Sequence, residues 1–248
     1  MLKYQQIKLT YVVPVYLEHN LNGLYALINS YSAYKPSVLR HIHFIFINDC
    51  SPVEITIPED CSLNYTLAKI TTDIKWNQGG ARNLGVHLAK SQKLIVTDLD
   101  HIFPEAIFKF LVTHPIPDHI FKFRRKRDNA RNQAHFNTFF LSKSIYFKSL
   151  GVDEEFCGNY GHEDTFFVAF QKRLGTKIFT FKDKTIFSHE HKISNNRHHN
   201  LIRDLRPTAD LYEAKKRILL DQSRDPFDAH SRLFLNFEWH LVKEEIHL

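Results

Sequence analysis

The stretch IVTDLDHIF, residues 95–103, places two carboxylates one residue apart directly after an apolar run. Residues 94–96 are typical of the end of a buried strand, and Asp98 and Asp100 follow almost at once. Two carboxylates so close together repel each other unless a cation, an arginine or a shared proton offsets their charge. The stretch therefore predicts a strand that ends in a charged site.

Strand-like and helix-like segments alternate around this motif. Continuous apolar strands that alternate with helices are typical of an α/β fold, in which a mostly parallel sheet is covered by helices on both faces. In the first half of the chain, strands are expected at 7–15, 42–47, 65–70 and 94–97, and helices at 20–34, 80–90 and 104–111.

The second half is less regular, and no internal repeat or linker divides it. Apolar runs and helical spacing predict shorter elements there, followed by two C-terminal helices. Strands are expected at 120–123, 136–141, 178–181 and 185–187, and helices at 163–174, 209–220 and 229–241, with a loop at 194–200.

Composition places the chain among globular proteins. Hydrophobic residues make up 43% and charged residues 24% of the chain, which is ordinary for a globular protein. Its 248 residues suffice for one large domain, or for one domain with a small appendage. The formal charge of +6 favours anionic partners, such as phosphorylated ligands, nucleic acid or an acidic membrane face.

The cysteines and the N-terminus predict a cytoplasmic protein. Cys50, Cys61 and Cys157 are odd in number and lack zinc-finger spacing, so a reduced compartment is expected. The apolar run at 11–15 is too short for a signal-peptide core, and no run approaches the roughly 18 residues of a membrane span.

Polar side chains gather at the predicted carboxyl ends of the strands, where open parallel sheets bind their ligands. Asp49 follows one strand, and Asp98 and Asp100 follow another, so one pocket can collect all three. The helix that begins within NQGGARNLG (77–85) adds backbone N–H groups and Arg82, which suit a phosphate. Carboxylates beside a phosphate seat make chemical sense when a divalent metal bridges them. A metal nucleotide is therefore predicted here.

Two later stretches could complete such a site. Glu163 and Asp164 stand at a predicted helix start, after a glycine-rich aromatic loop, where a carboxylate can serve as a general base. His189 and His191 follow a strand and could bind the metal.

Each feature also has a simpler explanation. A D-x-D pair arises by chance or by helix capping, Asp49 suits a turn, and acidic residues in a first helical turn are ordinary caps. The basic run FRRKRD (123–128) suits a solvated face, and a lone histidine after a strand is usually not a metal ligand. The occurrence of all these elements in this order favours the functional interpretation.

Six segments together resemble the family 2 glycosyltransferases and related enzymes of the GT-A fold. NxGxARNxG and G-x-E-D are the most specific patterns, and the resemblance covers roughly residues 8–191. The chain is also similar to bacterial capsule polymerase domains and to galactosyltransferases that share G-x-E-D. The segments are VVPVYLEHN, FINDCSP, NQGGARNLG, TDLDHIF, GNYGHEDTFF and SHEH.

The resemblance implies an inverting transfer of a sugar from a nucleotide-diphosphate sugar, usually a UDP-sugar, with Mn²⁺ or Mg²⁺. The acceptor would be a hydroxyl of a glycan or glycolipid, as in bacterial surface polysaccharide synthesis. Residues 1–191 would form the GT-A domain, with a donor half at about 1–103 and an acceptor half at about 104–191. Residues 192–248 would be a helical extension of the same domain.

The resemblance also assigns residues by position. Asp100 and His189 would bind the metal, with His191 as a substitute, while Asp164 would be the base and Glu163 would hold the acceptor. Asn48 stands where the family more often has an aspartate. The residues that would bind the nucleotide sugar are Pro14, Tyr16, Glu18, Asp49, Arg82 and Asp98.

Two other classes of protein remain as alternatives. A haloacid-dehalogenase-like phosphatase would use the aspartate that ends VTDLD as a nucleophile, but the usual Gly-Thr does not follow it. A basic nucleic-acid-binding module would use FRRKR, but no recognisable RNA- or DNA-binding motif accompanies that run. We therefore expect no nucleic-acid partner, and we expect any membrane contact to be peripheral.

Overall fold

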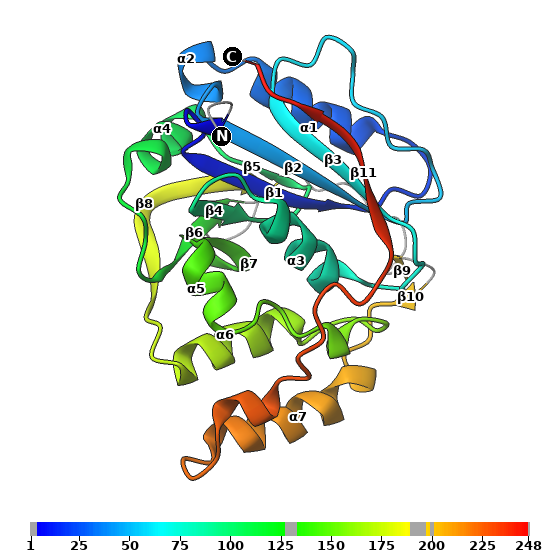
Figure 1. Cartoon of the computed structure of the whole chain (residues 1–248), viewed down its shortest axis with the longest axis vertical. Coiled ribbons are helices and arrows are strands. Elements are labelled where there is room, and N and C mark those ends of the chain that lie inside the picture. Colours follow the sequence, from blue (N-terminus) through cyan, green and yellow to red (C-terminus); the bar gives the residue numbers. More distant parts are fainter. Residues whose placement is uncertain (1–3, 127–132, 189–196, 199–200, 248) are drawn as a thin grey trace.

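A nine-stranded sheet runs through the molecule in the order β11-β3-β2-β1-β4-β7-β6-β8-β5 (Figure 1). The computed structural model describes residues 4–126, 133–188, 197–198 and 201–247. The strands are β1 (Leu9–Val15), β2 (Ile42–Asp49), β3 (Asn64–Ile70), β4 (Lys93–Val96), β5 (His101–Ile102), β6 (Ile120–Lys126), β7 (Gln133–Ser142), β8 (Ile178–Ser188) and β11 (Trp239–Glu245), and β9 (Arg197–His198) pairs separately with β10 (Leu201–Ile202).

The first half of the sheet has the predicted arrangement. Strands β3, β2, β1 and β4 are parallel neighbours, and their nearly continuous burial explains their apolar sequences. Beyond β4 the sheet is mixed, because β7 is antiparallel to both β4 and β6, while β6 and β8 are parallel. The two short strands expected at 178–181 and 185–187 are one continuous strand, β8.

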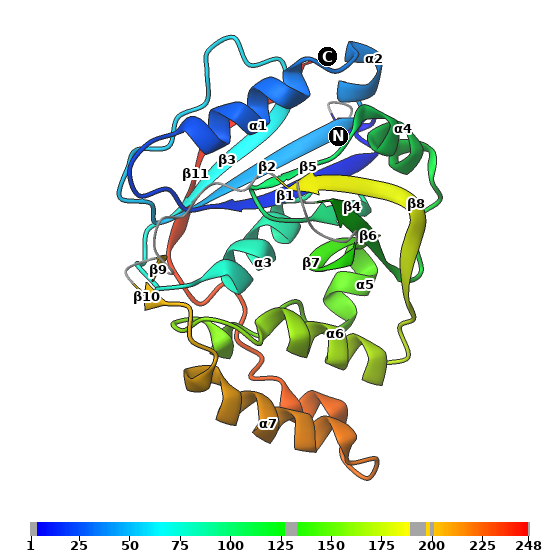
Figure 2. The same cartoon turned by 180° about the vertical axis from the view of Figure 1, so that it is seen from behind.

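Helices cover both faces of the sheet, as the α/β prediction requires (Figures 1 and 2). Side chains of α1, α2 and α4 join one buried cluster, and side chains of α3, α5 and α6 join another on the opposite face. Helix α7 forms a third cluster with α6. The helices are α1 (Asn22–Ser32), α2 (Pro36–Leu39), α3 (Gln78–Leu88), α4 (Glu105–Thr113), α5 (Lys143–Lys148), α6 (Glu163–Arg173) and α7 (Arg206–Leu220), with 3-10 turns at Glu154–Phe156 and Pro226–Ala229.

The prediction of a helix at 229–241 is wrong. After a single 3-10 turn at Pro226–Ala229 the chain is irregular, with left-handed backbone at Arg232 and Leu235, and β11 then pairs antiparallel with β3. Apolar residues recur at every second position from Leu233 to Leu241, which is the period of a strand. The end of the predicted helical extension is therefore an edge strand of the main sheet.

Glu154 anchors this returning segment. Its buried carboxylate accepts hydrogen bonds from Asn83 Nδ2 (2.8 Å), from the N–H of Leu235 (2.8 Å) and from the N–H of Asn236 (3.0 Å). One carboxylate thus joins α3 to the chain that leads into β11. Within the described residues, no helix combines the length and the apolar character that crossing a bilayer requires.

We predict that Glu154→Ala destabilises the fold strongly, because it leaves three donors in a buried position without their acceptor. The expected loss is about 2–4 kcal/mol of unfolding free energy, measured by urea titration. Its neighbour Glu155 is exposed, and within the described residues its ion pair is with Lys215, so Glu155→Ala should change stability by less than about 1 kcal/mol. Equal losses in the two variants would contradict this role for Glu154.

Candidate active site

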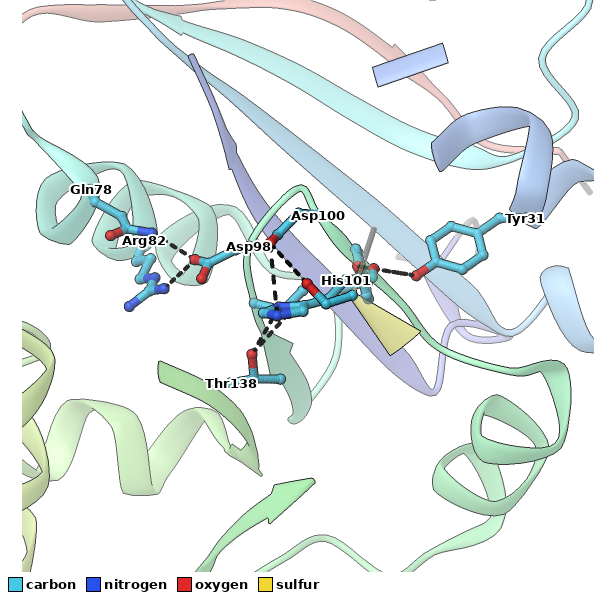
Figure 3. A network of polar contacts seen from close by, with 10 residues as sticks. Tyr31, Gln78, Arg82, Asp98, Asp100, His101 and Thr138 are labelled. Carbon is cyan, nitrogen blue, oxygen red and sulfur yellow. Dashed lines mark hydrogen bonds and ion pairs between the residues drawn. The ribbon is translucent and has the colours of Figure 1, made fainter. Parts of the chain in front are cut away.

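The carboxylates of IVTDLDHIF lie at the carboxyl end of β4, next to a histidine. One ligand atom each from Asp98, Asp100 and His101 lie within 4.8 Å of one another (Figure 3). This group stands beside the parallel strands, where α/β sheets bind their ligands. The structure thus confirms that the two aspartates share one small volume.

An arginine offsets the charge of Asp98. Arg82 Nη2 lies 2.6 Å from Asp98 Oδ1, and Gln78 Nε2 donates to the same oxygen at 2.6 Å. Gln78 and Arg82 stand one turn apart on α3, so they present their polar ends to the same carboxylate. Arg82 is only 1% exposed. Arg82, predicted to bind the nucleotide sugar, therefore lies against Asp98. It neutralises the charge of that carboxylate and orients it.

Asp100 is more accessible than Asp98. Its side chain is 38% exposed, and it accepts a hydrogen bond from Ser188 Oγ at 3.2 Å. His101 Nε2 lies 3.7 Å from Asp100 Oδ1, while Nδ1 of the same ring lies 3.2 Å from Thr97 Oγ1 and 3.3 Å from Thr138 Oγ1. Asp100 is therefore the aspartate of the pair that faces outward.

Sequence reasoning missed His101, although it directly follows the D-x-D pair. The ring is buried, and burial is the main cause that lowers its pKa below the usual value, which favours the neutral imidazole. The charge of Arg125 also lowers this pKa, so β6 contributes a cation near the site. Adjacency to Asp100 was the signal that could have identified His101.

Two tyrosines hold the chain that leaves the site. The hydroxyls of Tyr11 and Tyr31 donate to the carbonyl oxygen of His101 at 3.2 and 3.3 Å, and Tyr31 accepts from the N–H of Phe103 at 3.2 Å. Both tyrosines are fully buried. These two buried tyrosines therefore fix the backbone that carries Asp100 and His101.

Asp49 lies at the same edge of the sheet, at the end of β2. It is buried and accepts a hydrogen bond from Asn77 Nδ2 at 3.1 Å. Burial is the main cause that raises its pKa to about 7. Tyr16 is close enough that the charges of Glu18 and Asp49 raise its pKa, although burial raises it more. Tyr16, in the loop after β1, therefore lies near Asp49, while nucleotide-sugar binding by Tyr16 and Glu18 stays a prediction.

Pro14 lies in β1 beyond its pairing with β4. The β1–β4 register ends at Val12 with Val96, whereas Pro14 still pairs with Ile47 of β2. Pro14, the first residue predicted to bind the nucleotide sugar, thus lies where β1 no longer pairs with β4. Such a position tolerates a residue without an N–H.

The glycines of NQGGARNLG serve packing. A Cβ on Gly79 would lie 2.8 Å from Val152 Cγ1, and a Cβ on Gly80 would lie 2.6 Å from Phe237 Cε1. The backbone of Gly80 also hydrogen-bonds the Cys157 thiol. The glycine side of the α3 start is therefore covered by protein.

Asn83 of the same motif fixes the loop that leads to α6. Its Oδ1 accepts from Tyr146 Oη (2.7 Å) and the N–H of Val152 (2.9 Å), and its Nδ2 donates to Val152 O and Glu154, each at 2.8 Å. All four contacts are buried. Arg82 and Asn83 therefore join two parts of the site. Arg82 binds Asp98, and Asn83 binds the loop before Glu163.

Glu163 and Asp164 occupy different environments at the start of α6. Glu163 is buried, its Oε2 has no hydrogen-bond partner among the described residues, and burial is the main cause that raises its pKa to about 7. The charges of Arg82 and Asp98 also act on Glu163, which places it near the first group of residues. Asp164 is partly exposed and accepts from the N–H of Thr165 at 2.6 Å.

The remaining predicted ligands cannot be placed. His189 and His191 lie outside the described residues, which end at Ser188 and resume at Arg197. Ser188 itself contacts Asp100. The described chain before both histidines therefore ends at Ser188, beside Asp100.

No protein-family model matches this chain, and no curated protein matches its sequence. Solved structures do resemble it. It is similar to TarS of S. aureus in complex with UDP-GlcNAc, with a TM-score of 0.65 and 15% identity over 90% of this chain and 69% of that chain. The chain spans 60% of another TarS 1-349 structure and 41% of a longer TarS chain.

Two further similarities involve other sugar nucleotides. The mannosyltransferase PcManGT from Pyrobaculum calidifontis, in complex with GDP-Man and Mn²⁺, has a TM-score of 0.56 and 13% identity over 89% of this chain and 66% of that one. A mutant of Drosophila β1,4-galactosyltransferase 7, in complex with manganese, UDP-Gal and xylobiose, has a TM-score of 0.53 and 13% identity over 93% and 83%. These similarities confirm the GT-A fold.

We predict that Asp49 makes the protein less stable as pH rises. Its pKa is higher in the folded state (about 7) than the ordinary 3.8, so the folded state binds more protons between these values and stability falls as pH rises through that window. Asp49→Asn removes this loss. The Tm advantage of Asp49→Asn over the wild type should therefore grow by roughly 5 °C between pH 5 and pH 8.

The matched control is Asp210→Asn, which changes an exposed aspartate on α7. Its Tm difference from the wild type should stay constant between pH 5 and pH 8. A constant difference for Asp49→Asn as well would show that the buried Asp49 does not hold a proton near neutrality.

Proposed function

We propose that this chain is a metal-dependent glycosyltransferase that moves a sugar from a nucleotide-diphosphate sugar, foremost a UDP-sugar, to a hydroxyl of a glycan or glycolipid. The observation that carries the proposal is the meeting of Asp98, Asp100 and His101 within 4.8 Å. The GT-A fold of the solved structures that bind UDP-GlcNAc, GDP-Man and UDP-Gal supports it. Synthesis of a bacterial surface polysaccharide is the setting we infer from the family 2 resemblance.

The side chains of this group suit Mn²⁺ or Mg²⁺. Carboxylate oxygens are preferred ligands of both ions, and an imidazole is a further ligand that Mn²⁺ accepts. Asp98 Oδ1 already receives two hydrogen bonds, so the more exposed Asp100 is the better first ligand, with His189 as the second in our proposal. A divalent ion bound there would offset the charge of the leaving diphosphate.

Glu163 and Asp164, the two carboxylates at the start of α6, have separate roles in this proposal. The raised pKa of Glu163 keeps part of its population protonated near neutrality, so that it can donate a hydrogen bond to an acceptor hydroxyl. The more exposed Asp164 would take the proton of the attacking hydroxyl. Attack from the face opposite the leaving diphosphate inverts the anomeric carbon and requires no covalent intermediate.

The phosphatase alternative is disfavoured by the residues that follow the aspartate that ends VTDLD, because His101 and Ile102 stand where the usual Gly-Thr would be. The other aspartate of the pair, Asp98, is held by two donors. In this structure Arg82 and Gln78 both donate to Asp98 Oδ1, each at 2.6 Å. The carboxylate is thus oriented by its neighbours.

We predict that Asp100→Ala abolishes metal-dependent donor binding and preserves the fold. Asp100 is partly exposed and accepts a hydrogen bond from the Ser188 hydroxyl at the edge of the site, so its loss should leave the core intact. Calorimetry with UDP and Mn²⁺ measures the binding. Asp118→Ala, at a side chain that is 88% exposed, is the control with the same charge change. Unchanged UDP affinity in Asp100→Ala would refute the assignment.

We also predict that Asp164→Asn leaves donor binding within a few-fold of the wild type but lowers turnover by about 10² to 10⁴, the usual contribution of a positioned base. The substitution keeps the size of the side chain and removes the group that accepts the proton. Nucleotide release with donor and acceptor measures turnover, and calorimetry measures donor binding.

Glu163→Gln is the companion variant, and it should act mainly on acceptor affinity. An inactive Glu163→Gln beside a near-normal Asp164→Asn would exchange the two roles. Normal transfer by both variants would reduce the pair to a helix cap and disprove the proposed mechanism.

A further inference from the structure

The basic run that follows Phe121 lies on β6, and the charge of Arg125 within this run acts on His101 of the candidate active site. Arg124 and Lys126 are two residues apart, so their side chains share one face, while Lys122 lies before the irregularity that interrupts both ladders of this strand. Arg124 and Lys126 are exposed and Lys122 is half-buried. Figure 1 shows β6 in the mixed half of the sheet, together with β7 and β8. The run is therefore an ordered row of cations.

Carboxylates of the described chain leave this row uncompensated. No described Asp or Glu forms an ion pair with Lys122, Arg124 or Lys126. Asp164 is the carboxylate whose charge acts on Lys122. One end of the row thus lies near the proposed base, and within the described residues no ion pair neutralises Arg124 or Lys126.

Exposed aromatic rings flank the row. Lys122 Nζ lies 5.8 Å from the ring centroid of Phe136, which is 73% exposed. Phe187 is 43% exposed and stands opposite Lys126 in the β6–β8 register. Successive side chains of a strand point to opposite faces, so Phe187 and Lys126 share the face opposite to that of Ser188, which donates to Asp100. The row therefore begins near Asp164 and ends on the strand next to the one that carries Ser188.

We infer that these five residues, Lys122, Arg124, Lys126, Phe136 and Phe187, bind the acceptor, and that the acceptor is an anionic glycan. The inference rests on the proposed function and specifies its substrate class. Anionic groups along the acceptor complement the cations of β6, while exposed aromatic surface is typical of a binding site. Carboxylates of uronic acids and phosphodiesters between sugars or polyols share the required chemistry. We name the five residues the β6 strip.

The test compares two double variants that remove the same charge. Arg124→Gln/Lys126→Gln alters the β6 strip, and Arg217→Gln/Lys177→Gln alters two exposed positions, on α7 and just before β8. Three probes are titrated by calorimetry at low and high salt: a hyaluronan hexasaccharide, the same hexasaccharide with its carboxylates reduced to alcohols, and an oligomer of glycerol phosphate.

We predict that the Arg124/Lys126 variant binds at least one of the two anionic probes about tenfold more weakly than the wild type, because two charge contacts are lost. The Arg217/Lys177 variant should stay within about twofold. The reduced hexasaccharide should bind weakly to all three proteins, and added salt should weaken anionic binding to the wild type. The better of the two anionic probes distinguishes a carboxylate from a phosphodiester acceptor.

Equal weakening in the two variants, or equal wild-type affinity for the hexasaccharide and its reduced form with no binding of glycerol phosphate, would overturn the inference. Binding to phosphatidylglycerol vesicles without binding of either anionic probe would also overturn it and assign the strip to a membrane surface. Nucleotide release from a panel of sugar nucleotides with Mn²⁺ is measured separately. A failure there with the expected binding pattern would refute the proposed function and leave the strip as an anionic-glycan site.

Discussion

The ion pair between Arg82 and Asp98 is the interaction on which the rest of the site depends. A guanidinium that is 1% exposed has lost most of its hydration, and a carboxylate at 2.6 Å compensates for that loss. The pair joins α3 to the end of β4, and Asn83, the next residue, joins α3 to the loop before α6. One helix therefore sets the relative positions of both acidic groups.

This arrangement places similar carboxylates in different environments. Asp98 is bound to an arginine, Asp100 faces outward, and burial raises the pKa of Asp49 and Glu163 to about 7. A single edge of the sheet thus offers an oriented carboxylate, an accessible carboxylate and two groups that can carry a proton near neutrality. Groups whose pKa values are separated by their surroundings are typical of enzyme active sites.

Most of the fold could be predicted from the sequence, because buried parallel strands and amphipathic helices have distinct periods. The helix predicted at 229–241 failed because residues from Leu233 to Leu241 also contain several apolar side chains within each helical turn. What decides between helix and strand there is the unpaired edge of β3, which offers hydrogen bonds to β11. An edge formed by residues far away in the chain is not visible in a local pattern.

The sequence by itself determined that Asp49, Asp98 and Asp100 meet at one edge, because parallel strands end together. It also determined that Arg82 and the acidic start of α6 belong to the same region. Only the tertiary structure decided that Arg82 neutralises Asp98, that His101 lies beside Asp100, and that Lys122, Arg124 and Lys126 form a row near the site. The physical reason is that a motif specifies which groups are present, whereas distance and burial, which set charge and accessibility, arise only when separate segments pack together.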